Sequence, residues 1–211
     1  MDLQRQGAEC IACLSFTPEC TRSANLIHTT YHVLQFEEKT KVQVQDIDYV
    51  FEFGGGYGSM CRLFHNLGFR GRYIIIDLPP FSALQKYYLG TLGLPIRSVT
   101  DFERSKSGIV CVSDIHKLKS ILADRIEARN TMFIATWSIS ETPISIRNSI
   151  LPLTSGFQSF LLAYQDRFEE VNNVDFFNKW KETINEIAWQ SWRIRHIPGN
   201  NYLVGRVAAN S

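Results

Sequence analysis

Four glycines alternate with other residues after an acidic residue, between an apolar stretch and a segment with helical periodicity. The run reads Glu52-x-Gly54-x-Gly56-x-Gly58. Glycine lets a backbone pass close beneath a ligand where any side chain would collide with it. The N-terminus of the following helix offers free N–H groups and the positive end of its dipole. The pattern predicts a nucleotide-binding turn, with a tight structural turn as the alternative.

The glycine spacing differs from that of a nicotinamide dinucleotide site. That site uses G-x-G-x-x-G, which would place the third small residue at Ser59 when counted from Gly54 and Gly56. The acid before the turn is not part of that fingerprint. A nicotinamide oxidoreductase is therefore the weaker alternative.

Two further acids follow predicted strands. Asp77 ends the apolar run 73–76 and lies 19 residues after Gly58. In doubly wound nucleotide-binding folds an acid at this place binds the ribose hydroxyls, because a carboxylate accepts two hydrogen bonds at once. The alternative is a helix cap, since prolines follow at 79 and 80. Asp114 ends the next strand. It could face a ligand at the same edge of the sheet, or it could be the N-cap of a helix over 116–128.

These residues need a sheet to position them. Apolar runs without alternation indicate parallel strands covered on both faces, and we expect strands at 47–53, 73–77, 108–113, 132–138 and 156–164, followed by a hairpin of 189–197 and 202–207. The fold class is therefore α/β, with a seven-stranded, mostly parallel sheet and a C-terminal antiparallel hairpin. Helices are expected from Ser23, after the glycine turn up to Gly68, and over 80–92, 116–128 and 174–188.

Helical periodicity also predicts buried faces. The first helix places Ile27, Tyr31 and Leu34 on one face, and the charged stretch 37–41 reads as a solvated linker. The helix over 80–92 carries its apolar residues near helical spacing, and they are Phe81, Leu84, Tyr88 and Leu92.

Length and charge limit the classes of protein. A chain of 211 residues predicts one main domain, with residues 1–45 as a helical lead-in or lid and 46–211 as the nucleotide-binding domain. A net charge of +1 selects neither nucleic acid nor an anionic membrane. No apolar run approaches the ~20 residues that span a bilayer. No signal peptide is visible, so a cytoplasmic location is expected.

The cysteines do not predict a disulfide framework or a metal site. Their number, five, is odd. Cys10, Cys13 and Cys20 with His28 could form a Cys3His zinc site, but the second half of such a site lacks a regular paired spacing. We therefore expect no metal.

Several stretches together resemble class I S-adenosylmethionine (SAM) methyltransferases, and more closely the bacterial sugar O-methyltransferases. They are 51–58 (Phe-Glu-Phe-Gly-Gly-Gly-Tyr-Gly), 74–79 (Ile-Ile-Ile-Asp-Leu-Pro), 84–89 (Leu-Gln-Lys-Tyr-Tyr-Leu) and 138–142 (Ser-Ile-Ser-Glu-Thr). The resemblance covers about residues 23–207. The chain departs from the pattern at Ser59 and Thr142, where Gly and Met are expected, and its N-terminal region is short.

The resemblance implies a Rossmann-like fold, SAM as cofactor, and transfer of a methyl group to a hydroxyl of a sugar or similar small molecule. The implied cofactor-binding residues are Glu52, Gly54, Gly55, Gly56, Tyr57, Gly58, Asp77, Leu78, Asp114, Ile115 and Trp137. Glu52 would orient the glycine turn or meet the cofactor's amino group, Tyr57 would cover its carboxylate end, and Asp114 would meet the adenine. Trp137 would face the sulfonium, since aromatic faces attract cations, or it is an ordinary core tryptophan.

A sugar hydroxyl is a poor nucleophile while it keeps its proton, so a general base is expected. Glu141 after the fourth strand is the first candidate, and the alternative is that it caps the next helix or pairs with Arg147 on that helix. His32 on the N-terminal helix is the second candidate. The expected partner is a small-molecule or saccharide acceptor, with no nucleic acid and no membrane, and a homo-oligomer is left open. A catalytically silent SAM-fold partner or regulatory subunit is the alternative function, which the short N-terminal region favours.

Overall fold

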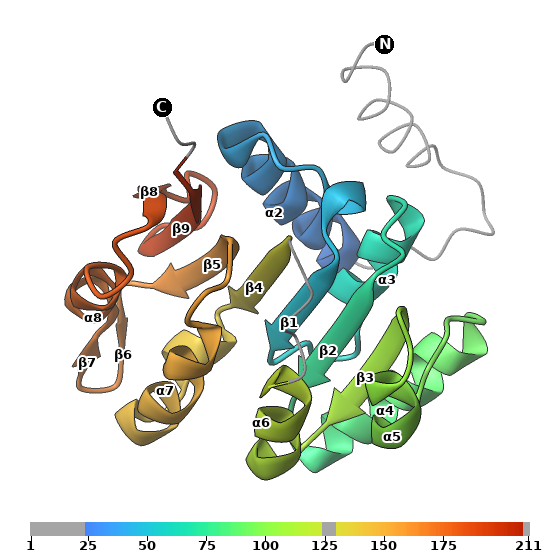
Figure 1. Cartoon of the computed structure of the whole chain (residues 1–211). Coiled ribbons are helices and arrows are strands. Elements are labelled where there is room, and N and C mark those ends of the chain that lie inside the picture. The colour runs from blue at the N-terminus through green and yellow to red at the C-terminus, as the bar shows by residue number, and fades with distance from the viewer. Residues whose placement is uncertain (1–23, 124–129, 209–211) are drawn as a thin grey trace, which may run out of the picture.

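The computed structural model describes residues 24–123 and 130–208, and a seven-stranded sheet forms its centre (Figure 1). The strand order is β3-β2-β1-β4-β5-β9-β8. The strands are β1 (Tyr49–Phe53), β2 (Arg72–Ile76), β3 (Gly108–Val112), β4 (Thr131–Thr136), β5 (Ser159–Gln165), β8 (Ile187–Arg193) and β9 (Asn200–Val207). The first five run parallel, and β9 is antiparallel to both of its neighbours. This confirms the predicted sheet.

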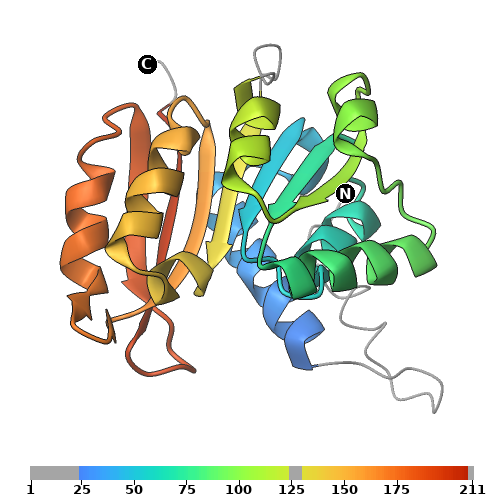
Figure 2. The ribbon, with the colours of Figure 1, turned by 90° about the horizontal axis from the view of Figure 1, so that it is seen from below.

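Helices cover both faces of the sheet (Figures 1 and 2). The first face packs against α2 (Ala24–Thr40), α3 (Ser59–Asn66) and α4 (Pro79–Thr91). The opposite face packs against α5 (Val99–Glu103), α6 (Ile115–Ala123), α7 (Ile144–Ile150) and α8 (Asn173–Lys181). Short 3-10 helices η1 (Val44–Asp46), η2 (Ser138–Glu141) and η3 (Leu151–Thr154) join the layers, and β6 (Arg167–Phe168) and β7 (Val171–Asn172) form a separate hairpin.

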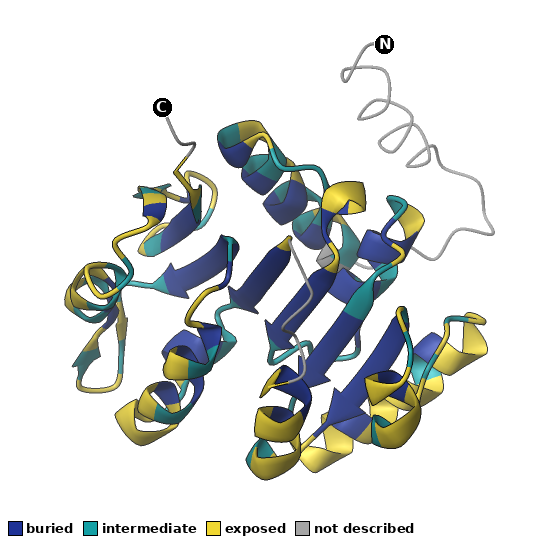
Figure 3. Cartoon of the chain, viewed as in Figure 1, coloured by how far each residue is buried: buried dark blue, intermediate teal, exposed yellow. Residues whose placement is uncertain are grey.

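The central strands are buried except for a partly exposed residue at one end of β1, β2, β4 and β5, as Figure 3 shows for the sheet as a whole. Successive side chains point to opposite faces, so Tyr49 and Phe51 of β1 pack with α5 and α6, whereas Val50 packs with α2 and α3. This is why the apolar runs do not alternate. Both cores hold the sheet rigid, and its carboxyl-terminal edge is therefore a fixed platform for a site.

Helix α2 differs from the prediction at its end and on its face. It continues through Thr40, so the expected linker at 37–41 is wrong up to that residue. The Glu37 carboxylate accepts a 3.0 Å hydrogen bond from the backbone nitrogen of Val44, which gives these charges a structural role. The buried face carries His32, Val33 and Phe36, whereas the predicted Ile27 is 52% exposed and Leu34 38% exposed.

Helix α4 also turns a different face inward. Ser82, Gln85 and Leu89 are buried, while the predicted Phe81 and Leu84 are 43% and 44% exposed. This face points inward because Gln85 donates a hydrogen bond to the glycine turn, and this contact sets the rotation of the helix.

The ends of two helices require comparison with the prediction. Helix α8 ends at Lys181 rather than near 188, because Ile187 pairs with Val207 and begins β8. The described part of α6 runs from Ile115 to Ala123, and the predicted continuation to 128 lies outside the described residues. The expected helix start at Ser23 and the cysteines at 10, 13 and 20 also lie outside them. Within the described ranges, no helix is long and apolar enough to cross a membrane.

Candidate functional site

The glycine turn begins where β1 ends. The backbone nitrogen of Gly54 donates a 2.8 Å hydrogen bond to the carbonyl of Ile76 on β2, and Gly54 has a φ of +73°. A Cβ at this position would lie 2.2 Å from Cβ of Ser138, whose hydroxyl donates to the Phe53 carbonyl. Only glycine allows the ends of β1 and β4 to approach this closely.

Gly56 is held from two sides. Its backbone nitrogen donates to Oδ2 of Asp77 at 2.9 Å, and its carbonyl accepts from Nε2 of Gln85 at 2.8 Å. Gln85 also donates to the same Asp77 oxygen at 3.2 Å, while Oδ1 of Asp77 accepts from the Leu78 nitrogen at 2.8 Å. A carboxylate oxygen can accept two hydrogen bonds, so Oδ1 keeps acceptor capacity for a ligand.

The space above Gly56 is open. Its φ is +56°, and a Cβ built there would meet nothing within 4 Å. Gly58, with a φ of +97°, caps the N-terminus of α3 and donates from its nitrogen to the Gly55 carbonyl at 2.9 Å. The turn therefore presents bare backbone next to a helix N-terminus, which is the arrangement that anionic and nucleotide ligands use.

Glu52 lies beneath the turn and is buried. Its carboxylate accepts a 2.9 Å hydrogen bond from the hydroxyl of Tyr73. Burial raises the pKa of Glu52 to about 7, although the Tyr73 hydrogen bond acts in the opposite direction. A Cβ on Gly55 would come within 3.0 Å of the same carboxylate, so Glu52 supports the turn directly.

A cavity of about 230 Å³ opens beside the turn. It brings together seven predicted residues, which are His32, Glu52, Gly54, Gly55, Gly56, Tyr57 and Trp137. It also contains five that the sequence reasoning did not assign to the site, which are His28, Thr29, Ser59, Met60 and Thr136. The cavity therefore lies between helix α2 and the carboxyl-terminal ends of β1 and β4.

Trp137 follows β4 in a strained conformation, with a φ of +65°. Its backbone nitrogen donates to the Ala163 carbonyl and its indole nitrogen to Oδ1 of Asn200, both at 2.6 Å. A non-glycine residue at positive φ persists only where its surroundings fix it. These two hydrogen bonds hold the indole against the cavity, 5.0 Å from the ring of His28 and 5.2 Å from that of His32.

His32 is buried, and its side chain is hydrogen-bonded inside the fold. Its Nδ1 lies 2.5 Å from the hydroxyl of Tyr202, and burial, followed by the neighbouring His28 and His196, lowers the pKa of His32 to about 3. Burial raises the pKa of the Tyr202 phenol, which therefore stays protonated while it is hydrogen-bonded to His32.

His28 was missed as a site residue. Its ring centroid lies 4.4 Å from that of His32, and burial lowers the pKa of His28 below 6.5. Its Nε2 is buried without a hydrogen-bond partner among the described residues. The signal was present in the sequence, since residues four apart on a helix share a face.

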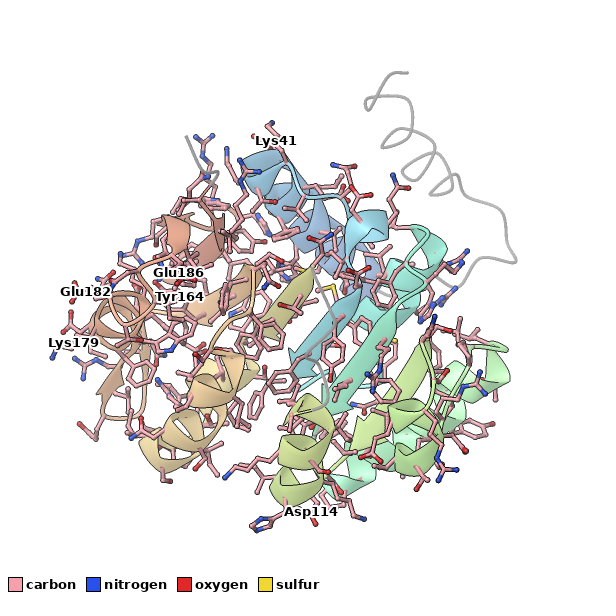
Figure 4. All side chains as sticks on the ribbon, viewed as in Figure 1. Lys41, Asp114, Tyr164, Lys179, Glu182 and Glu186 are labelled. Carbon is pink, nitrogen blue, oxygen red and sulfur yellow. The ribbon has the colours of Figure 1, made fainter. Side chains whose placement is uncertain are left out.

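The remaining predicted residues do not line the cavity. Gly58 and Asp77 adjoin it through the turn, and Leu78 is 66% exposed. Asp114 is exposed at the N-terminus of α6, where its Oδ1 accepts from the His116 nitrogen at 2.7 Å (Figure 4). Ile115 is the first residue of that helix.

Glu141 is exposed at the end of η2, outside the cavity. The alternative that it pairs with Arg147 is wrong. The buried guanidinium donates instead to the carbonyls of Ser140 and Thr142 and to the side chain of Asn173. Arg147 therefore fixes the loop that follows β4.

Within the described part of the chain, neither a metal-binding cluster nor the larger hollow competes with this cavity as the candidate site. Among residues 24–123 and 130–208, no group of three or more His, Cys, Asp or Glu side chains could hold a metal ion. A larger hollow of about 800 Å³ lies between η3 and α8, lined mostly by apolar residues such as Leu151, Phe176 and Trp180. It shares no residue with the glycine turn, so the smaller cavity is the candidate site.

Comparison with known proteins gives the fold. No protein-family model matches the sequence, and neither does any curated protein. The methyltransferase domain of a bacterial protein, CtHen1-C, superposes with a TM-score of 0.59 at 11% identity, covering 89% of this chain and 100% of that one. An O-methyltransferase from Bacillus cereus, in complex with SAH, superposes with a TM-score of 0.54 at 10% identity, covering 99% of this chain and 92% of that one. The magnesium protoporphyrin IX methyltransferase from Synechocystis PCC 6803 with bound SAM superposes with a TM-score of 0.54 at 11% identity, covering 87% of this chain and 80% of that one.

The fold is that of the class I methyltransferases. In this fold, as in other open α/β sheets, ligands bind at the carboxyl ends of the strands where the strand order reverses. Here that point lies between β1 and β4. The cavity at the glycine turn occupies this place, which is consistent with the predicted site.

Proposed function

We propose that this chain is a SAM-dependent methyltransferase that moves a methyl group to a hydroxyl of a sugar or similar small molecule. The observation that carries the proposal is the glycine turn, open above Gly56 and fixed by Asp77, at the strand reversal of a class I methyltransferase fold. The sequence resemblance to sugar O-methyltransferases supports the acceptor class.

The residues present fit the cofactor. Asp77 would accept a hydrogen bond from a ribose hydroxyl through the remaining acceptor position of Oδ1, and the bare backbone of Gly56 would let the cofactor approach. Glu52 would face the amino group, and Trp137 offers an aromatic face to a cation. When bound, SAM supplies an electrophilic methyl group on a sulfonium.

The adenine would lie toward the ends of β2 and β3. The backbone nitrogen of Asp77 donates to the Val112 carbonyl at 3.1 Å, so the segment from Asp77 to Leu78 runs beside the one that leads to Asp114 and Ile115. Asp114 already caps α6, and its second oxygen remains for a ligand.

In the reaction the chain would position the acceptor and take up the proton of its hydroxyl. Alignment of an acceptor oxygen with a reacting carbon can supply roughly 7–11 kcal/mol of barrier reduction, and a general base adds roughly 10²- to 10⁴-fold in rate. A hydroxyl acceptor needs such a base, and the cavity contains imidazoles to provide one.

Calorimetric titration with S-adenosylhomocysteine (SAH) tests the cofactor, with NADH titrated in parallel. Micromolar binding of SAH that disappears in Asp77→Ala supports the proposal. Binding of NADH in place of SAH would instead support an oxidoreductase. Transfer from methyl-labelled SAM to a panel of monosaccharides and glycosides then tests the activity. SAH binding with no transfer to any acceptor would support the silent partner.

A further inference from the structure

Three imidazole rings lie together beside the glycine turn. The ring centroid of His28 is 4.4 Å from that of His32 and 5.6 Å from that of His196. Trp137 packs against the first two, and Tyr31 packs edge-on against His196 at 4.9 Å. Histidine is the side chain whose ordinary pKa best suits proton transfer near neutral pH.

Two other proton acceptors of the cavity already take part in hydrogen bonds inside the fold. Glu52 lies under the turn and receives the hydroxyl of Tyr73. Nδ1 of His32 is hydrogen-bonded to the hydroxyl of Tyr202. An atom that is hydrogen-bonded inside the fold is less available to a substrate.

His28, by contrast, has a ring nitrogen without a hydrogen-bond partner among the described residues. This nitrogen is Nε2, and His28 lines the cavity. A buried polar atom without a partner is costly and calls for an explanation. A hydroxyl of a bound acceptor would satisfy it.

The surroundings of His28 keep it neutral. Burial and the nearby His196 both lower its pKa from 6.5, because a charged ring would lose hydration and would face a second imidazole. The neutral form carries the lone pair that a general base requires.

We propose that His28 is the residue that takes the proton from the acceptor hydroxyl. This inference rests on the proposed function and names its general base. The acceptor's proton moves to Nε2 of His28, and a lone pair of the acceptor oxygen forms the new bond to the methyl carbon. The carbon–sulfur bond breaks and its electron pair stays on sulfur, which becomes a neutral thioether. The imidazolium then returns its proton to solvent.

The test uses the difference between SAM and SAH, which is a methyl group and one positive charge on sulfur. The full chain, with ¹⁵N-labelled histidine, is titrated with acid by NMR while saturated with either molecule. The positive charge on the sulfur of SAM would disfavour a second positive charge on the His28 ring. The midpoint of the His28 titration should therefore be lower with SAM than with SAH by about half to two pH units. His28→Asn identifies the resonance, and His116 on α6 is the internal control with no shift expected.

The outcomes separate the two proposals. A lower midpoint with SAM, and a neutral ring at pH 7, supports His28 as the base. Equal midpoints in the two complexes, or a charged ring at pH 7 with SAM, would overturn it while the cofactor assignment stands. If neither molecule binds, the methyltransferase proposal fails and the role of His28 falls with it.

Discussion

The backbone nitrogen of Gly56 donates a 2.9 Å hydrogen bond to Asp77, which lies 21 residues later at the end of the neighbouring strand. The carboxylate that would bind a ribose thus also holds the loop that would lie beneath the cofactor. Gln85 of α4 joins both partners, so three elements define the shape of the turn. Binding of a ribose at Asp77 would therefore be coupled to the geometry of the loop through this one side chain.

Replacing Asp77 by Asn should weaken the binding of SAH. The amide keeps the shape but has one acceptor oxygen, so it cannot serve both Gly56 and Leu78. Hydrogen bonds to a charged group are worth about 1.5–3 kcal/mol, and we expect a dissociation constant about 10- to 100-fold higher by calorimetry. Glu182→Gln on the exposed end of α8 is the matched control and should bind as the wild type does (Figure 4). Equal affinities in all three proteins would contradict the role of Asp77.

Gly54→Ala should destabilise the fold more than Gly93→Ala. Both glycines have a φ of +73°, so both variants pay for the same backbone conformation. A Cβ at Gly54 would lie 2.2 Å from Cβ of Ser138, whereas one at Gly93 meets nothing within 4 Å. Overpacking typically costs about 1–3 kcal/mol, and urea unfolding should show a difference of this size. Identical losses would show that the ends of β1 and β4 can separate freely.

Glu52→Gln should remove a pH dependence of stability. The folded protein holds a proton on Glu52 up to about pH 7, whereas the unfolded chain releases it near 4.5. The unfolded state therefore binds fewer protons in this range, and this group lowers stability as the pH rises from about 4.5 to 7. The difference amounts to roughly 3 kcal/mol.

Glutamine cannot ionise and still offers an oxygen to Tyr73. The free energy of unfolding of Glu52→Gln, minus that of the wild type, should therefore increase between pH 5 and pH 8 in urea titrations. A difference that stays constant over this range would show that the Glu52 carboxyl titrates normally.

Tyr202→Phe should destabilise the protein by about 1–3 kcal/mol. It removes the hydroxyl that is hydrogen-bonded to Nδ1 of His32 and leaves this buried ring nitrogen without a partner. Tyr87→Phe makes the same chemical change at a side chain that is 72% exposed, and it should leave stability unchanged. Chemical unfolding of the two variants measures the comparison. No loss in Tyr202→Phe would mean that His32 finds another hydrogen-bond partner.

The sequence by itself determined the sheet and the turn. Unbroken apolar runs predicted parallel strands buried on both faces, and the glycine spacing after Glu52 placed a ligand turn at the end of β1. Both signals are local, since an apolar run and a cluster of glycines are each made of residues close together in the chain. Seven of the predicted site residues consequently lie in one cavity.

Only the tertiary structure decided how the site is completed. His28 and His32 are brought to the cavity by packing of α2 against α3 and β9, and the hydroxyl that fixes His32 comes from a residue 170 positions away. Helix α4 presents Gln85 rather than Phe81 to the interior because the turn needs a donor. Helical periodicity alone cannot rank two faces when one carries a polar group with a distant partner, so these contacts were not readable from the sequence.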